Sequence, residues 1–124
     1  MDHWFVSYSS EDGTQHASRV HDELVGGVQP IPVWFAPTRM SVGHYPAQID
    51  GALRDAAGVL FIATPGSMNN QNCDDELKRA REYGKPIVPL VFAPALRMTL
   101  LVADSQYVDF FEDFETGIAR LRNY

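Results

Sequence analysis

Short apolar runs alternate with amphipathic stretches along most of this chain. The apolar runs predict five strands, at residues 4–8, 31–35, 58–64, 86–92 and 106–110. The stretches between them place apolar residues at helical spacing, as Ala17, Val20 and Leu24 do. They predict helices that end at Gly26, start at Pro46 and cover residues 72–83, 94–103 and 111–123. Strands that alternate with helices in this way predict a parallel sheet covered on both faces.

The run over residues 58–64 is the most apolar and is expected at the centre of the sheet. Pro89 lies inside the fourth run, and because its nitrogen cannot donate to a ladder, we expect that strand near the sheet edge or at a bulge. No internal repeat or linker interrupts the chain, so residues 1–124 are expected to form a single domain. In such sheets ligands bind outside the carboxyl ends of the strands, where the strand order reverses.

Composition and charge narrow the classes of function. The 124 residues are 45% hydrophobic and 21% charged, ordinary values for a globular domain with a core. The formal net charge of −6 argues against a surface for nucleic acid or anionic membrane. No apolar run approaches the ~20 residues of a membrane span, and the N-terminus lacks signal-peptide features. The single cysteine, Cys73, excludes an internal disulfide, and a cytoplasmic location is expected.

The familiar sites of α/β domains are missing from the sequence. The loop after the first strand holds one glycine, Gly13, where a dinucleotide-binding turn needs G-x-G-x-x-G. There is no Gly-Lys-Ser/Thr triplet and no G-x-S-x-G elbow, and the third strand ends at Thr64 instead of a phospho-acceptor aspartate. No metal site is expected, because the four histidines share no ligand spacing. These histidines are His3, His16, His21 and His44.

An acidic segment begins the helix predicted over residues 72–83 and has two readings. Asn72 is expected as the N-cap and Asp75 at the capping-box position, and carboxylates in a first turn favour the helix dipole. This structural reading accounts for Asp74 and Asp75. Glu76 flanks the apolar stripe of the helix and faces the expected ligand crevice after the third strand. Glu76 is therefore a candidate functional carboxylate as well as an ordinary first-turn residue.

Four segments of the chain, taken in order, resemble the sequence boxes of TIR (Toll/interleukin receptor) domains. They are FVSYSSED at residues 5–12, VWFAP with VGHY at residues 33–45, CDDE at residues 73–76 and GKPIVPL at residues 84–90. They match the opening box, the second strand with the BB loop after it, the Cys-x-x-Glu of the third helix, and the fourth-strand box. The resemblance is closer to bacterial TIR domains than to animal receptors. It implies an α/β, flavodoxin-like three-layer sandwich with a five-stranded parallel sheet.

Some TIR domains are scaffolds, and others cleave NAD+. In the enzymes a glutamate of the third helix is essential, and it matches Glu76. The substrate-binding positions that the resemblance implies are Tyr8, Ser9, Ser10, Phe35, Arg39, Tyr45 and Asn72. Asn72 stands where several of the enzymes have the tryptophan of Trp-x-x-x-Glu, and Ala36 stands where the BB loop often begins with an acidic residue.

The resemblance thus implies an NAD+ nucleosidase that releases nicotinamide together with ADP-ribose or a cyclic ADP-ribose product. NAD+ is the expected substrate, and no cofactor or metal is expected. Other TIR domains are the implied partners, through the BB loop at residues 36–45, with a sensor domain as a further partner in a full-length protein. The resemblance also implies that self-assembly activates the enzyme, in a bacterial immune and signalling system of antiviral defence. Two alternatives stay open: a non-enzymatic TIR–TIR scaffold, and a domain that binds a nucleotide signal without turnover.

Overall fold

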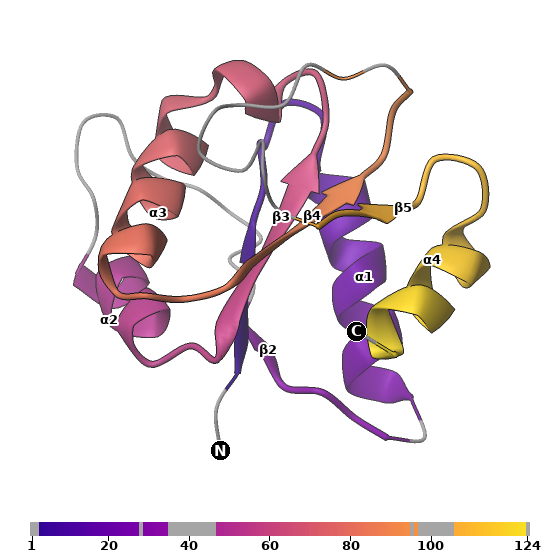
Figure 1. The fold of residues 1–124 in the computed structure, drawn as a ribbon, viewed down its shortest axis with the longest axis horizontal. Coiled ribbons are helices and arrows are strands. Elements are labelled where there is room, and N and C mark those ends of the chain that lie inside the picture. Colours follow the sequence, from indigo (N-terminus) through magenta and orange to yellow (C-terminus); the bar gives the residue numbers. More distant parts are fainter. Residues whose placement is uncertain (1–2, 28, 35–46, 95, 97–105, 124) are drawn as a thin grey trace.

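The computed structural model describes residues 3–27, 29–34, 47–94, 96 and 106–123, and there strands alternate with helices (Figure 1). The strands are β1 (Trp4–Ser7), β2 (Val33–Trp34), β3 (Gly58–Ala63), β4 (Ile87–Val91) and β5 (Val108–Asp109). The helices are α1 (Thr14–Gly26), α2 (Ala47–Arg54), α3 (Gln71–Glu82) and α4 (Phe114–Arg122), with a 3₁₀ turn, η1 (Ser67–Asn69), ahead of α3. None of these helices is long and apolar enough to cross a membrane.

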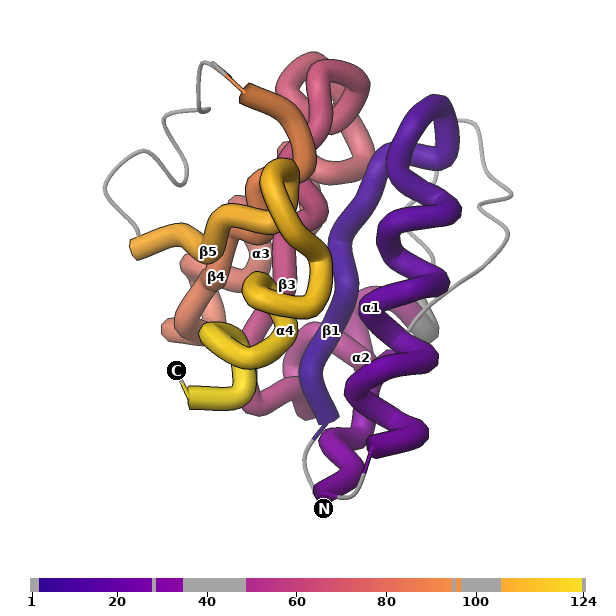
Figure 2. Tube along the Cα trace, turned by 90° about the vertical axis from the view of Figure 1, so that its right-hand side faces the viewer, coloured from indigo at the N-terminus to yellow at the C-terminus, as the bar shows by residue number. Residues whose placement is uncertain are grey.

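The five strands form one parallel sheet in the order β2-β1-β3-β4-β5. Helices α1 and α4 cover one face, and α2 and α3 cover the other (Figures 1 and 2). The predicted parallel sheet with helices on both faces is therefore confirmed, and its strand order is the flavodoxin-like one. The chain reverses its direction across the sheet between β1 and β3, which places the switch point at the carboxyl ends of these two strands.

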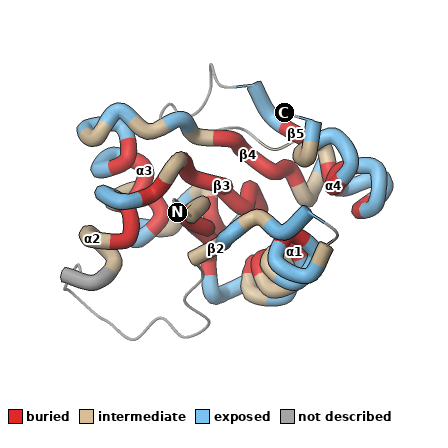
Figure 3. The backbone as a smooth tube through the Cα atoms, turned by 90° about the horizontal axis from the view of Figure 1, so that it is seen from below, coloured by how far each residue is buried: buried red, intermediate tan, exposed pale blue. Residues whose placement is uncertain are grey.

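The sheet separates two apolar cores. Val6 of β1 packs in the core under α1 and α4, and its neighbour Phe5 packs in the core under α2 and α3, because successive strand residues face opposite sides. All six residues of β3 are buried, as Figure 3 shows for the middle of the sheet. The predicted central position of this apolar run is confirmed.

Pro89 lies in β4, which is the strand next to the edge strand β5, so the predicted place near the sheet edge agrees with the structure, although β4 is not the edge strand itself. The Pro86 carbonyl accepts from Val59 of β3, and the Val91 carbonyl accepts from Phe110 beside β5. Since these groups alternate along the strand, the nitrogen of Pro89 faces the β5 side. Pairing with β5 begins only at Leu90, and the proline therefore removes no ladder hydrogen bond.

Helix α3 begins earlier than its predicted start. Its N-cap is Asn70, whose side-chain oxygen accepts a hydrogen bond of 3.0 Å from the Cys73 N–H. Asn72 is therefore in the first turn and is not the cap. Asp75 does not complete a capping box either, because its carboxylate accepts from the side-chain amide of Gln71 at 2.8 Å and not from the backbone N–H of the cap residue.

Gly84 ends α3 as predicted. Its φ of 70° is in the left-handed region that favours glycine. The N–H of Lys85 then reaches back to the Ala80 carbonyl at 2.9 Å, and that of Gly84 to the Arg81 carbonyl at 3.0 Å, which satisfies the last carbonyls of the helix.

Other elements differ in extent from their predictions. β5 and α4 are shorter than the predicted strand over 106–110 and helix over 111–123, because residues 110–113 turn between them. The helix predicted over residues 94–103 and the segment 35–46, which includes the BB loop, lie almost wholly or wholly outside the described residues.

Candidate functional site

The loops that follow β1 and β3, residues 9–13 and 64–70, meet at the switch point. Asp12 joins them, because its carboxylate accepts the Thr64 hydroxyl at 2.6 Å and the Gly66 N–H at 2.8 Å. A side chain at Gly66 would displace the Asp12 carboxylate, since an added Cβ would lie 2.5 Å from one of its oxygens. The two loops therefore form one connected edge above the sheet.

Ser9 makes a second connection between the same loops. It is fully buried, and its hydroxyl oxygen accepts from the Glu11 N–H at 3.2 Å and from the Asn70 amide at 3.5 Å. Asn70 thus contacts the first loop with its amide nitrogen while its oxygen caps α3. The start of α3 is held against the end of β1 by this contact.

Glu76 lies on the inner side of α3 and only 1% of its surface is exposed. The Ser7 hydroxyl, at the carboxyl end of β1, donates a hydrogen bond of 2.8 Å to Glu76 Oε1. The helix carries this carboxyl inward because its apolar stripe packs in the core under α2 and α3. The stripe consists of Cys73, Leu77 and Ala80. A buried carboxylate is costly unless hydrogen-bonded, and the Ser7 hydroxyl supplies such a bond.

A polar contact also ties α3 to α2. The Tyr83 hydroxyl donates a hydrogen bond of 2.7 Å to the Asp50 carboxylate, and Arg79 Nε lies 3.7 Å from the same oxygen. The hydrogen bond to Asp50 raises the pKa of Tyr83 above its usual value. The helix that carries Glu76 is thus held at its end as well as at its beginning.

The other predicted site residues are placed differently. Tyr8 is fully buried with Val6 in the core under α1 and α4, which is the opposite face of the sheet from α3. Ser10 is exposed in the loop ahead of α1, and Asn72 is exposed in the first turn of α3. The predicted residues Phe35, Arg39 and Tyr45 lie outside the described residues. Glu76 and Ser9 are therefore the predicted residues whose side chains join α3, or its N-cap, to the end of β1.

Sequence reasoning missed Ser7, Asp12 and Asn70. Ser7 did carry a signal, because it is a polar residue at a position of β1 that shares the face of Phe5. Such a residue in a buried strand needs a hydrogen-bond partner. Asp12 and Asn70 carried no comparable signal, because both stand in polar loops where asparagine and aspartate are common.

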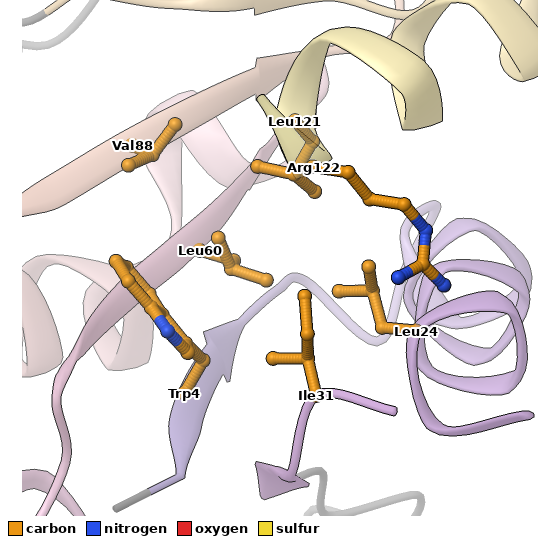
Figure 4. A pocket seen from close by; sticks show the side chains of 7 residues that line it. All are labelled: Trp4, Leu24, Ile31, Leu60, Val88, Leu121 and Arg122. Carbon is orange, nitrogen blue, oxygen red and sulfur yellow. The ribbon is translucent and has the colours of Figure 1, made fainter. Parts of the chain in front are cut away.

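An apolar cavity of about 120 Å³ lies on the other face of the sheet, under α1 and α4 (Figure 4). It is lined by Trp4, Leu24, Ile31, Leu60, Val88, Leu121 and Arg122. Arg122 donates to the Glu23 and Gln29 carbonyls, both at 2.9 Å, and so stabilises the C-terminal end of α1. This cavity is on the opposite face of the sheet from Glu76, and its lining residues include no carboxylate.

Within the described part of the chain, no group of three or more His, Cys, Asp or Glu residues could hold a metal ion. Cys73 is the single cysteine of the sequence and is buried in the core under α2 and α3. His16 stacks on Phe92 with ring centroids 4.2 Å apart, and His21 is bonded to the neighbouring Asp22.

Comparison with known proteins agrees with this fold. The family model for the TIR domain matches residues 5–122. Comparison with curated protein sequences gave no match. The crystal structure of the TIR domain of the Toll-related receptor TRR-2 from Hydra magnipapillata is similar, with a TM-score of 0.69 and 19% identity, over 97% of this chain and 92% of that one. The TIR domains of the activated Roq1 resistosome, which directly recognises the pathogen effector XopQ, give a TM-score of 0.70 and 12% identity, over 99% and 98%. Since the family match covers nearly the whole sequence, this chain belongs to the TIR domain family.

Proposed function

We propose that this TIR domain is an NAD+ nucleosidase in which Glu76 is the catalytic carboxylate. The observation that carries the proposal is the position of Glu76, buried beside the switch point and hydrogen-bonded to Ser7. An apolar side chain at this position would pack beside Leu77 at a lower cost than a buried carboxylate. A chain that keeps the carboxylate there, at the edge where such folds bind ligands, favours the functional reading over the structural one.

The proposed reaction breaks the bond between the nicotinamide nitrogen and C1′ of the ribose. The electron pair of this bond leaves with the nicotinamide, which becomes neutral, and the ribose acquires oxocarbenium character. A carboxylate near the ribose can hold its hydroxyls and stabilise this developing positive charge, with little need for a general acid. Capture of C1′ by water gives ADP-ribose, and capture by the adenine or ribose of the same molecule gives a cyclic product.

The amino end of α1 is the proposed site for the diphosphate of NAD+. Its N-cap, Gly13, offers no side-chain acceptor, and no acidic residue stands in the first turn. The backbone N–H groups of this turn are therefore available to an anion, and the helix dipole favours one there. Ser9 and Ser10 precede this helix in the same loop.

Substrate contact requires a rearrangement around Glu76, because only 1% of its surface is exposed. A carboxylate that is covered in the single chain and uncovered on assembly is in keeping with an enzyme activated by its own oligomerisation. One comparison structure shows the TIR domains of the activated Roq1 resistosome, and we propose other TIR domains as partners of this chain through residues 36–45.

The proposed function is tested by incubating concentrated protein with NAD+ and separating the products by chromatography. We expect nicotinamide together with ADP-ribose or a cyclic isomer, and a rate per molecule that rises across a hundredfold range of protein concentration. Intact NAD+ at every concentration would contradict the enzyme proposal.

A TIR–TIR scaffold without catalysis is the second candidate. The observation that favours it is the exposed Asn72, at the position where several TIR enzymes have a tryptophan. This candidate predicts concentration-dependent oligomers in sedimentation velocity and no nicotinamide release by those oligomers.

A further inference from the structure

Ser7 is a polar residue in an apolar setting. Its side chain shares a face of β1 with Phe5, it lies opposite Phe61 in the pairing with β3, and it has no exposed surface. A hydroxyl in such a place is costly unless it forms a hydrogen bond. Its bond to Glu76 Oε1 joins residues that are 69 positions apart in the chain.

The two partners differ in stiffness. β1 is an inner strand of the sheet, and Ser7 is held in its ladder with β3, opposite Phe61. The serine side chain has a single rotatable bond to its hydroxyl, whereas the glutamate side chain has three before its carboxylate. The bond therefore fixes the flexible group to the rigid one. Precise placement of a reacting group is worth a large part of a catalytic barrier.

The bond also acts on charge. A hydroxyl that donates to a carboxylate favours the ionised form, which burial alone would disfavour. The proposed reaction needs the ionised form, because the neutral acid would not stabilise an oxocarbenium-like ribose.

We propose that Ser7 is the positioning residue of the site, holding the Glu76 carboxylate in place for the ribose. The inference rests on the proposed function of Glu76. Ser7 reaches the substrate only through Glu76, so its removal should lower kcat and leave KM nearly unchanged.

Ser7→Ala and Tyr83→Phe form a pair for the test. The Tyr83 hydroxyl donates a hydrogen bond of 2.7 Å to Asp50 and ties α3 to α2, whereas the Ser7 hydroxyl ties α3 to β1. Both variants lose a hydrogen bond that holds α3, so both should lose stability, but only Ser7→Ala removes a bond to Glu76. Ser7→Thr retains a hydroxyl and serves as the rescue variant.

The measurements are kcat, KM and the pH–rate profile for NAD+ cleavage, with thermal melting of each variant. Ser7→Ala should lower kcat about tenfold or more and move the acid limb of the pH–rate profile to higher pH. Tyr83→Phe should move neither, and Ser7→Thr should restore much of the rate. Equal kcat and equal pH profiles for Ser7→Ala and Tyr83→Phe would overturn the inference and leave the proposed function standing. Absence of turnover by the wild-type protein would overturn both.

Discussion

The Gly66 N–H donates a hydrogen bond of 2.8 Å to Asp12, although the two residues are 54 positions apart. The other Asp12 oxygen accepts from Thr64 at 2.6 Å, so one carboxylate holds the loop after β3 against the loop after β1. The contact is so close that a methyl group at Gly66 would displace the Asp12 carboxylate. The backbone of Gly66, with φ −67° and ψ −36°, would itself accept alanine without strain.

Gly66→Ala should therefore destabilise the protein through its contact with Asp12. The methyl group would displace the carboxylate and weaken its two hydrogen bonds, at a cost of about 1–3 kcal/mol. In an Asp12→Ala background the same change should be neutral or stabilising, because alanine lowers the entropy of the unfolded chain. Urea unfolding of the four proteins measures this coupling. An equal effect of Gly66→Ala in both backgrounds would show that the Asp12 contact is not the cause.

The N-cap of α3 gives a second prediction. Asn70→Ala should lower the free energy of unfolding by about 1 kcal/mol, because it leaves the Cys73 N–H without its acceptor. Asn72→Ala changes an exposed first-turn residue and should cost less than ~0.5 kcal/mol. Denaturant titration of both variants distinguishes the two positions. A larger loss of stability for Asn72→Ala would show that Asn70 is not the cap.

The parts of the fold that depend on local chemistry were predictable from the sequence. The apolar run over residues 58–64 indicated the central strand, because a short run of apolar residues is enough to predict burial. Gly84 indicated the end of α3, because a single glycine is enough to predict a positive φ. The start of α3 was not predictable in the same way. Asn69, Asn70 and Asn72 are all residues of a type that caps helices. The one that caps α3, Asn70, also contacts Ser9 in a loop that is distant in the sequence.

Long-range relationships explain the remaining differences. The place of Pro89 depends on where β5 begins to pair with β4, which the fourth strand alone does not reveal. The position of Glu76 beside the switch point followed from the expected fold and the TIR resemblance. Its burial agrees with the helical spacing, which places Glu76 next to the apolar stripe of α3. Its partner Ser7 was missed, because a pattern within one strand predicts that a buried serine needs an acceptor without saying which one.

The contact between Tyr83 and Asp50 predicts a pH-dependent difference. The hydrogen bond raises the pKa of Tyr83, so the folded protein holds the phenol proton more tightly than the unfolded chain. This contribution to stability is fully present below the unfolded pKa of about 10 and is lost as the pH rises through the folded pKa. Tyr83→Phe should therefore be less stable than the wild type at pH 8, and the gap should narrow above about pH 10. Urea titrations at several pH values test this, and a constant gap would contradict it.

The environment of His16 predicts how the stability of the protein changes as the pH falls below neutral. Burial lowers its pKa below 6.5, although the nearby Asp12 opposes the shift. The folded protein therefore holds the His16 proton less tightly than the unfolded chain. The resulting stabilisation is present above the unfolded pKa and is lost as the pH falls through the folded one. His16→Phe keeps the stack on Phe92 and cannot titrate, so between pH 7.5 and 5, about the range in which histidine titrates, it should lose less stability than the wild type. Parallel stability curves for the two proteins would contradict the assignment.

The most direct test of the account compares nicotinamide release by the wild type, Glu76→Gln and Asp75→Asn. Asp75 is on the same helix, but its carboxylate is bonded to Gln71 and is not buried, so Asp75→Asn should retain most of the turnover. Glu76→Gln should fold with only a small shift in melting temperature, because glutamine has nearly the same size as glutamate and its amide oxygen can still accept from Ser7. Its rate of nicotinamide release should fall about a hundredfold or more, which corresponds to ~3 kcal/mol of lost transition-state stabilisation. An active wild type whose folded Glu76→Gln variant keeps most of its rate would contradict the central role of Glu76.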